Sequence, residues 1–264
     1  MKKTSAKPTS RAAVRRGPGR PGRESASATE ITKEVLIMRA LELTRKEPLQ
    51  DISMLRLARE FGVTPGLIHY YLHGINRLLS GVINLYNRRL TESFPVASGN
   101  WRDDIERQFT TAYNFMIEYS GITAYIVAHN RFRLIQEVAP DEVDYGIVRF
   151  ETVSRTFRDA GFAPDDAAMN LHLITQFTMS CAHAFSLRQL PSEHESYLTD
   201  QLSKFSPKQA PGICFIRKSF VRMDADKVFR RGLTIHLDGF QVALDEKLNK
   251  SSSIVTLGEA KRRT

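Results

Sequence analysis

The stretch that decides the fold runs from residue 49 to residue 79 and reads LQDISMLRLAREFGVTPGLIHYYLHGINRLL. Its first part, 53–61, has helical spacing, and three apolar residues share one face: Leu55, Ala58 and Phe61. Gly62 and the valine after it then interrupt the helix. Thr64 is a suitable N-cap, and Pro65 fits the first position of a new helix, where its missing N–H costs nothing. The stretch therefore predicts two short helices separated by a tight turn.

Two short helices joined by a glycine-bearing turn form a helix-turn-helix, whose second helix enters the major groove of DNA. The second helix here would present polar and flat aromatic side chains together: Leu67, His69, Tyr70 and Tyr71. Several apolar residues of the motif are expected to form core instead: Leu55, Leu57, Ala58, Phe61 and Ile68. One of the two tyrosines is expected to contact a phosphate while the other packs, and the sequence leaves open which does which. The motif predicts DNA reading rather than catalysis.

The positive charge of the chain is concentrated at its N-terminus. The 264 residues carry a net charge of +9, from 38 Lys and Arg against 29 Asp and Glu. Eight of the basic residues, and no acidic residue, lie between Met1 and Arg23, so the remainder is nearly neutral. A basic segment of this kind binds polyanions by releasing their counterions. Residues 1–28, which lack aromatic side chains, are expected to form a disordered basic arm.

Within this arm, residues 15–23 read RRGPGRPGR. The Gly-Arg-Pro at 19–21 is similar to the core of an AT-hook, whose arginines enter a narrow, A·T-rich minor groove. On that interpretation Arg20 and Arg23 contact DNA. A generic basic tail without sequence preference explains the same composition, so both interpretations stay open. The arm has no apolar stretch, which argues against a secretory signal.

Length and composition are those of an ordinary globular chain, with 42% hydrophobic residues and room for one large or two small domains. The two cysteines, Cys181 and Cys214, indicate no disulfide framework and favour a reducing cytoplasm. No run approaches the roughly 18 apolar residues of a membrane span. We therefore expect a cytoplasmic protein that does not contact membranes.

Helical spacing continues along the rest of the chain, and no sustained alternation or hairpin signal predicts a sheet. A first helix is expected from Thr29 or Thr32 to near Pro48, and a fourth at 76–94. Further helices are expected at 101–119, from Gly121 to 139, and at 140–160, 164–187 and 224–248. Residues 191–223 are expected to form a long connection, with a short helix at most at 192–205. The predicted fold class is all-α.

Three segments of the chain resemble, in order and spacing, the DNA-binding domain of the TetR family of bacterial transcriptional regulators. They are 40–43 (ALEL), 53–64 (SMLRLAREFGVT) and 66–72 (GLIHYYL). Residues 229–240 (FRRGLTIHLDGF) are more weakly similar to the last helix of that family. The resemblance implies a three-helix DNA-binding head at 29–75 and, at 76–249, an all-helical body that binds a ligand and dimerises. A flexible tail is expected at 250–264.

Carried over by position, the resemblance implies DNA contacts at Thr64, Pro65, Leu67, His69, Tyr70 and Tyr71. Family members often use a Lys just before the fourth helix, where this chain has Ile75. That departure removes one expected phosphate contact, which Arg77, Asn76 or His73 could replace. The usual aromatic residue at the end of the first helix is Thr44 here, and the following glycine is Pro48. The head is therefore expected to pack slightly differently.

Two helical stripes in the body are candidates for lining a ligand cavity. The helix at 164–187 has four side chains on one face: His172, Gln176, Met179 and His183. The helix at 101–119 has three on one stripe: Phe109, Tyr113 and Met116. Hydrogen-bonded positions in a dimer seam, where we place His183, explain the first stripe equally well, and plain core explains the second. No carboxylate or cysteine shares the spacing, so a metal site is not expected.

Two glycines, Gly232 and Gly239, lie seven residues apart in the expected last helix. Each costs about 1 kcal/mol relative to alanine in a helix interior, which close helix–helix approach would offset. Ala225 and Ala243 extend the small face. We therefore expect both glycines in a homodimer interface, with surface glycines of no particular role as the alternative.

The chain contains no Gly-x-Ser-x-Gly, no phosphate-binding loop and no His-Glu-x-x-His, so neither an enzyme nor a cofactor is expected. We expect a homodimeric transcriptional regulator, most simply a repressor. It would bind double-stranded DNA and leave its operator when a small-molecule effector binds. The alternative is an architectural or nucleoid-associated DNA-binding protein without a small-molecule ligand. A closed cavity in the body of roughly a few hundred Å³ would favour the regulator.

Overall fold

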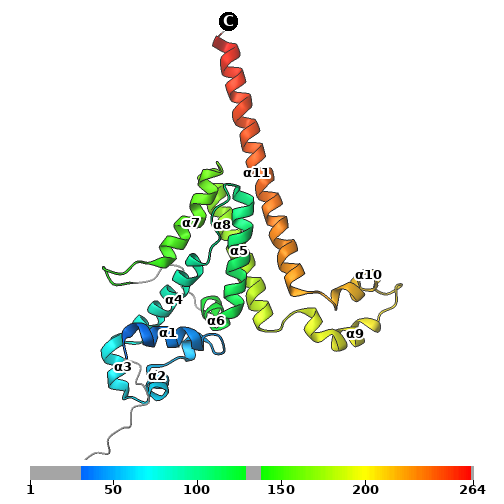
Figure 1. The fold of residues 1–264 in the computed structure, drawn as a ribbon. Coiled ribbons are helices and arrows are strands. Elements are labelled where there is room, and N and C mark those ends of the chain that lie inside the picture. The colour runs from blue at the N-terminus through cyan, green and yellow to red at the C-terminus, as the bar shows by residue number, and fades with distance from the viewer. Residues whose placement is uncertain (1–30, 129–137, 263–264) are drawn as a thin grey trace, which may run out of the picture. The chain divides into compact units, whose positions relative to one another are not determined.

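The computed structural model describes residues 31–128 and 138–262, and throughout these ranges the regular elements are helices. The arm residues Arg20 and Arg23, and Thr29, lie outside the described residues. Figure 1 shows the order of the helices along the chain. They are α1 (Lys33–Leu43), α2 (Met54–Phe61), α3 (Pro65–Leu72), α4 (Ile75–Glu92), α5 (Trp101–Glu118), α6 (Ser120–Ala128), α7 (Tyr145–Asp159), α8 (Pro164–Ser186), α9 (Glu195–Ser203), α10 (Pro211–Phe220) and α11 (Ala225–Arg262), with short 3-10 turns at Leu49–Asp51 and Pro191–His194.

The first three helices form the predicted head, and local sequence signals set their ends. Thr32 caps α1 through a hydrogen bond from the Val35 N–H, and Ser53 caps α2 through one from the Arg56 N–H. Gly62 ends α2 in the left-handed conformation with φ 63°, which favours glycine. The all-α fold and the helix-turn-helix are therefore confirmed.

Two details of the head differ from the sequence-based expectation. Leu55 is 48% exposed, whereas Leu57 and Ala58 are buried. Leu57 lies about 200° around the helix axis from Leu55, so the buried face of α2 is turned away from Leu55. Thr64 occupies the N-cap position of α3, but its hydroxyl makes no capping hydrogen bond. Both side chains are therefore left at the surface of the head.

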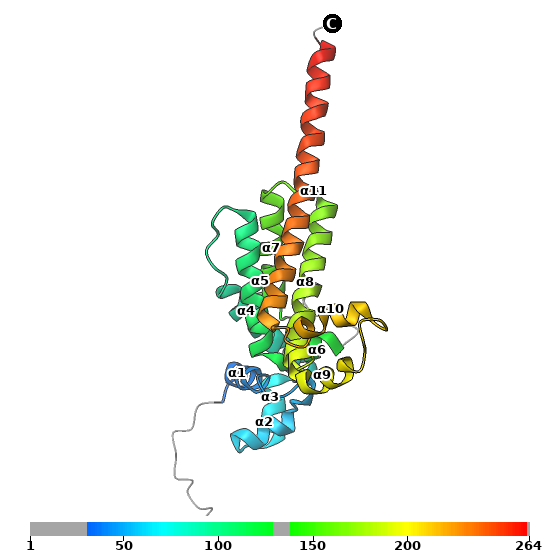
Figure 2. The ribbon, with the colours of Figure 1, turned by 90° about the vertical axis from the view of Figure 1, so that its right-hand side faces the viewer.

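The body is built around α5, α8 and α11, which lie side by side in Figures 1 and 2, with α7 packed on α5 and α8. Their apolar faces form one buried cluster: Ile105, Phe109, Tyr113, Met116, Val153, Phe157, Phe162, Ile174, Ala182, Phe229, Leu233, Leu237, Phe240 and Leu244. Helix α4 links head and body because it packs both on α1 of the head and on α7 of the body. A change in the body can thus reach the head through α4.

Helices α5 and α8 run in the same direction. Near their N-terminal ends, the Trp101 ring meets the Phe162 ring with centroids 5.1 Å apart. Further along, Tyr113 of α5 stacks on Phe229 at 3.9 Å, and Phe177 of α8 stacks on the same ring at 6.0 Å. Residues between these two levels on α5 and α8 therefore lie at similar heights in the body.

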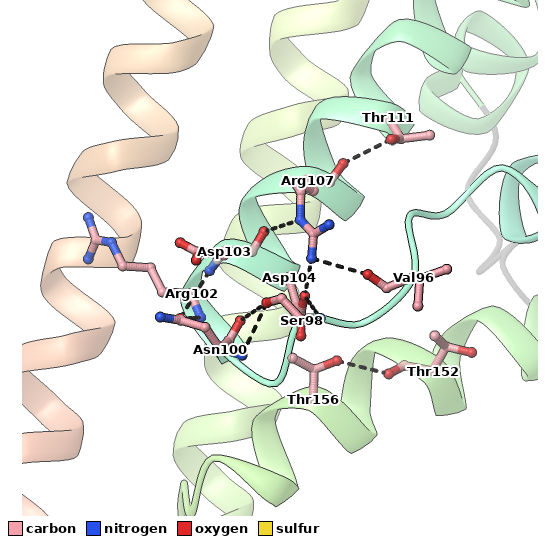
Figure 3. Close-up of polar contacts among 10 residues, drawn as sticks. All are labelled: Val96, Ser98, Asn100, Arg102, Asp103, Asp104, Arg107, Thr111, Thr152 and Thr156. Atoms are coloured by element: carbon pink, nitrogen blue, oxygen red, sulfur yellow. Dashed lines mark hydrogen bonds and ion pairs between the residues drawn. The ribbon is translucent and has the colours of Figure 1, made fainter.

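The connection between α4 and α5 is tied to the first turns of α5 (Figure 3). The buried Asp104 carboxylate accepts a hydrogen bond from the Ser98 N–H at 2.7 Å and pairs with Arg107 at 2.5 Å. Arg107 also donates to the Val96 carbonyl at 3.2 Å, and the Asn100 side chain caps α5. Although burial opposes it, hydrogen bonding to Ser98 and Arg107 holds the pKa of Asp104 below its usual value. The end of α4 is thus fixed to the body.

Several helix bounds differ from prediction. Gly121 does not separate two helices: the break is at Tyr119, and Gly121 lies in the first turn of α6. Helix α7 begins after the capping residue Asp144 rather than at Pro140. Helix α10 was missed because its Pro-Gly start was interpreted as a connection, although proline is favoured in a first helical turn. Helix α11 continues to Arg262 instead of ending near residue 248.

None of the helices in the described part of the chain is long and apolar enough to cross a membrane.

Candidate DNA-reading surface and effector site

Helix α3 presents the predicted DNA-reading residues to solvent. Thr64, Pro65, Leu67, His69 and Tyr70 are exposed, and Tyr71 is half-buried. Ile68 and Leu72, on the opposite face, are buried in the head. The Tyr70 ring is 69% exposed and meets only the edge of Tyr71, with centroids 5.3 Å apart. Tyr70 is thus the more exposed of the two tyrosines, and Tyr71 is the more buried one.

The turn into α4 supplies an exposed cation beside α3. His73 and Gly74 both have positive φ, 53° and 121°, so the chain turns sharply between the two helices. Ile75, at the position where a lysine was expected, is 41% exposed. Arg77 is exposed and forms no ion pair with any described residue. Arg77 is therefore an exposed cation two positions after Ile75, and its contact with a phosphate stays a prediction.

A cluster of charged and aromatic residues joins the head to the body. Glu42 of α1 pairs with Arg89 of α4 at 2.6 Å and with Arg45 at 2.6 Å. The Tyr119 hydroxyl, at the end of α5, accepts hydrogen bonds from Arg45 at 2.8 Å and Arg89 at 3.1 Å. Arg45 also pairs with Glu118. Against the effect of burial, Arg89 and Arg45 hold the pKa of Glu42 below its usual value.

Beside this cluster, α6 touches the end of α1 through its backbone. The Gly121 N–H donates to the Thr44 carbonyl at 2.8 Å. A Cβ at Gly121 would lie 2.0 Å from the Glu47 carbonyl oxygen and 2.8 Å from that of Thr44. Only glycine allows this approach. Thr44, which stands where an aromatic residue was expected, is fully buried and supplies this contact.

Buried polar atoms without partners mark the interior of the body. Within the described residues, four such atoms lack a hydrogen bond: Asn87 Nδ2, Gln108 Oε1, Tyr113 Oη and Asn170 Nδ2. Burying an unpaired polar group costs free energy, so orphaned groups of this kind indicate a missing ligand or water. Gln108 and Asn170 lie at similar heights on the adjacent helices α5 and α8.

Of the predicted cavity-lining stripe on α5, all three members are buried in the body. Phe109 and Met116 are apolar core. Tyr113 stacks on Phe229 and keeps an unpaired hydroxyl, and burial raises its pKa to about 12. Sequence reasoning missed Asn87, Gln108 and Asn170. A signal was available, because Gln108 follows Ile105 and precedes Ala112 at helical spacing on the buried face.

The stripe on α8 does not point into one cavity. His172 and Gln176 are exposed, while Met179 and His183 are half-buried, with Met179 packed on the core. The exposed pair shares the outer face of α8 with Met169 and Leu173. His172 and Gln176 are therefore at the surface of the described chain rather than in its interior, and the dimer-seam alternative stays a prediction.

The two glycines of α11 face different surroundings. A Cβ at Gly232 would lie 2.1 Å from Cζ of Phe177 in the same chain. Gly232 therefore allows close packing of α8 on α11 within the chain, and its place in a dimer interface stays a prediction. A Cβ at Gly239 meets nothing within 4 Å. Gly239 lies on the outer face of α11 between the exposed Ile235 and Val242.

A separate pocket of about 520 Å³ lies between α9 and α10, which project from the side of the bundle (Figure 1). Its lining is Glu195, Thr199, Leu202, Ser203, Arg217, Lys218, Val221 and Arg222. Arg222 pairs with Glu195 at 3.0 Å, and Arg217 donates to the Leu202 carbonyl at 3.3 Å. The pocket is apart from the predicted cavity-lining residues. Among the described residues, no group of three or more His, Cys, Asp or Glu could hold a metal ion.

No protein-family model and no curated protein sequence matches the chain. Several solved structures, however, are similar to it in fold. Apo ActR of Streptomyces coelicolor has a TM-score of 0.69 and 19% identity, over 82% of this chain and 98% of ActR. ActR, a TetR family protein, has also been solved in complex with actinorhodin (TM-score 0.66, 20% identity, 81% of this chain and 98% of ActR). SCO7222, a TetR from the same organism, has a TM-score of 0.63 and 14% identity over 81% of this chain and 99% of its own. The chain therefore has the fold of the TetR-family transcriptional regulators.

Proposed function

We propose that this protein is a sequence-specific DNA-binding transcriptional regulator of the cytoplasm that responds to a small molecule, acting as a repressor. The proposal rests on the exposed face of α3, the second helix of the helix-turn-helix. This face presents His69, Tyr70 and Thr64, and the Thr64 hydroxyl makes no capping hydrogen bond. Such a helix is shaped to reach base edges in the major groove. The shared fold with TetR-family regulators supports the same function.

The test is selection of DNA sites from a random pool by the full chain. A dimeric regulator is expected to enrich a near-palindrome whose half-sites lie one helical turn apart, about 34–36 Å. Footprinting on the genomic DNA that flanks its gene should then protect the same site. Enrichment of no sequence, with binding that follows salt concentration alone, would favour the architectural alternative and contradict the proposal.

Ligand response is supported by the orphaned polar atoms of the body and by ActR, a structural neighbour solved in complex with actinorhodin. An effector that hydrogen-bonds to Asn87, Gln108 or Asn170 would bind one arrangement of the body better than another. Because α4 joins the body to the head, that preference would change the separation of two recognition helices. The junction formed by Glu42, Arg45, Arg89 and Tyr119 lies on this route.

Homodimer formation is supported by the outer faces of α8 and α11. Four apolar side chains there are 43% to 58% exposed: Met169, Leu173, Ile235 and Val242. The two helices pack side by side, so their outer faces adjoin. A second copy that places the same two helices against them would form an isologous interface.

Ile235→Glu is expected to convert the dimer to monomer while leaving each chain folded. The substitution buries a carboxylate in the interface of both copies, at a cost of about 2–4 kcal/mol each. Light scattering at micromolar concentration measures the mass. Lys227→Glu, an exposed position of α11 outside the apolar cluster, is the control and should stay dimeric. A fully dimeric Ile235→Glu variant would contradict this interface.

A further inference from the structure

Helix α7 carries a cation on its buried face. Gly146, Val153 and Phe157 of α7 are buried. Arg149 lies three residues after Gly146 and four before Val153, so helical spacing places it on the same face. It is only partly exposed. Arg155 of the same helix is exposed and paired with Glu151 at 2.7 Å, so Arg149 differs from the surface arginines.

Helix α7 packs on α4 as well as on α5 and α8, and Arg149 interacts electrostatically with Tyr86 of α4. The Asn84 side chain fixes the start of α7, because it donates to the Val143 carbonyl at 2.9 Å and accepts from the Tyr145 N–H at 2.8 Å. Burial raises the pKa of Tyr86 to about 12. Tyr86 is therefore a neutral phenol near pH 7 and does not neutralise Arg149.

Arg149 has no counterion among the described residues: no described carboxylate forms an ion pair with it, and no described acceptor takes a hydrogen bond from it. Burial lowers its pKa from the usual value for arginine. A guanidinium in this position carries a desolvation penalty that a bound anion would offset. Asn87, which follows Tyr86 on α4, also carries a buried amide donor, Nδ2, without a described acceptor. Helices α4 and α7 pack on each other, and each therefore carries an unused donor group.

We propose that the effector of this protein is an anionic molecule with an apolar body, whose carboxylate, sulfonate or similar acidic group pairs with Arg149. Arginine suits this role because its planar guanidinium binds such oxygens in a bidentate manner. The inference rests on the proposed ligand response and specifies its chemistry.

The position of Arg149 connects such a ligand to the head. The Tyr86 ring meets the Tyr119 ring edge-on, with centroids 5.8 Å apart. Tyr119 in turn accepts the hydrogen bonds of Arg45 and Arg89 at the junction with Glu42 of α1. An anion at Arg149 that shifts Tyr86 would act directly on the contacts between α4 and α1.

The test uses two fluorescent probes that differ in one sulfonate: 8-anilino-1-naphthalenesulfonate and its uncharged analogue N-phenyl-1-naphthylamine. Each is titrated into the full-length wild type and into Arg149→Gln, Arg149→Lys and the control Arg155→Gln. Arg149→Gln is expected to bind the sulfonate about tenfold more weakly or worse, because a charged hydrogen bond is lost. Binding of the uncharged probe should not change, and Arg155→Gln should match the wild type. Arg149→Lys should bind the sulfonate more weakly than the wild type but more tightly than Arg149→Gln, because an ammonium keeps the charge and loses the bidentate geometry.

Equal sulfonate affinity of wild type and Arg149→Gln would overturn the proposal. So would an equal loss for both probes, or a wild type that binds neither probe. DNA binding by the same variants separates this inference from the proposed function. Arg149→Gln should still bind the selected DNA site, and a wild type that binds no specific site would instead contradict the regulator itself.

Discussion

Tyr70→Ala is expected to weaken binding of the selected DNA site by about 1–3 kcal/mol, or roughly 5- to 160-fold, without changing the fold. The Tyr70 ring is 69% exposed, and its aromatic contact with Tyr71 is edge-on, so the free protein loses little when the ring is removed. His69→Ala should act in the same direction from the adjacent exposed position. The double variant should show no measurable preference for the selected site over random DNA.

Fluorescence anisotropy with labelled DNA at one fixed salt concentration measures this loss, since affinity for DNA depends strongly on salt. Tyr197→Ala is a matched control, because Tyr197 is a comparably exposed tyrosine of α9, outside the head. It should bind like the wild type, and circular dichroism should give the same melting temperature for all variants. Wild-type affinity in both Tyr70→Ala and His69→Ala would show that α3 does not read the DNA.

Gly121→Ala is expected to be among the most damaging single substitutions outside the buried apolar cluster of the body. Its Cβ would lie 2.0 Å from the Glu47 carbonyl oxygen, and a backbone atom cannot rotate away as a side chain can. Helix α6 must then separate from the end of α1, which breaks the hydrogen bond from the Gly121 N–H to the Thr44 carbonyl. Overpacking of this kind costs about 3 kcal/mol, which corresponds to a fall in melting temperature of roughly 10 °C.

Thermal unfolding followed by circular dichroism measures this effect. Gly212→Ala is the control, because a Cβ there meets nothing within 4 Å and the substitution also lies in a first helical turn. It should melt like the wild type or slightly higher, since alanine favours helix. If Gly121→Ala melts within about 2 °C of the wild type, the close contact between α6 and the end of α1 is absent in solution.

The helices of the head could be predicted because local sequence signals set their ends. Ser53, Gly62 and Pro65 each act on their own helix end, so the helix-turn-helix follows from residues a few positions apart. The same reasoning placed α8 at 164–187, against the observed Pro164–Ser186. It failed for Leu55, because spacing within one helix does not tell which face will meet a partner helix.

The candidate effector site was less predictable for a related reason. His172 and Gln176 share one face of α8, as predicted, but this face is exposed. The side chains of Asn87, Gln108 and Asn170 are buried instead. A single polar residue on an apolar helix face is a weak signal. Whether it is paired depends on side chains from other helices, which no one segment specifies.

The sequence by itself determined the all-α fold, the helix-turn-helix and the exposure of its second helix, because helix caps, glycine turns and apolar spacing act within a few residues. Only the tertiary structure decided that Gly232 receives Phe177 of its own chain, that Gly121 touches the backbone of Glu47, and that Arg149 lies near Tyr86 without a described carboxylate partner. Gly232 and Phe177 are 55 positions apart in the chain, Gly121 and Glu47 are 74 apart, and Arg149 and Tyr86 are 63 apart. Contacts at such separation arise from how whole helices pack against one another, and local spacing carries no information about them.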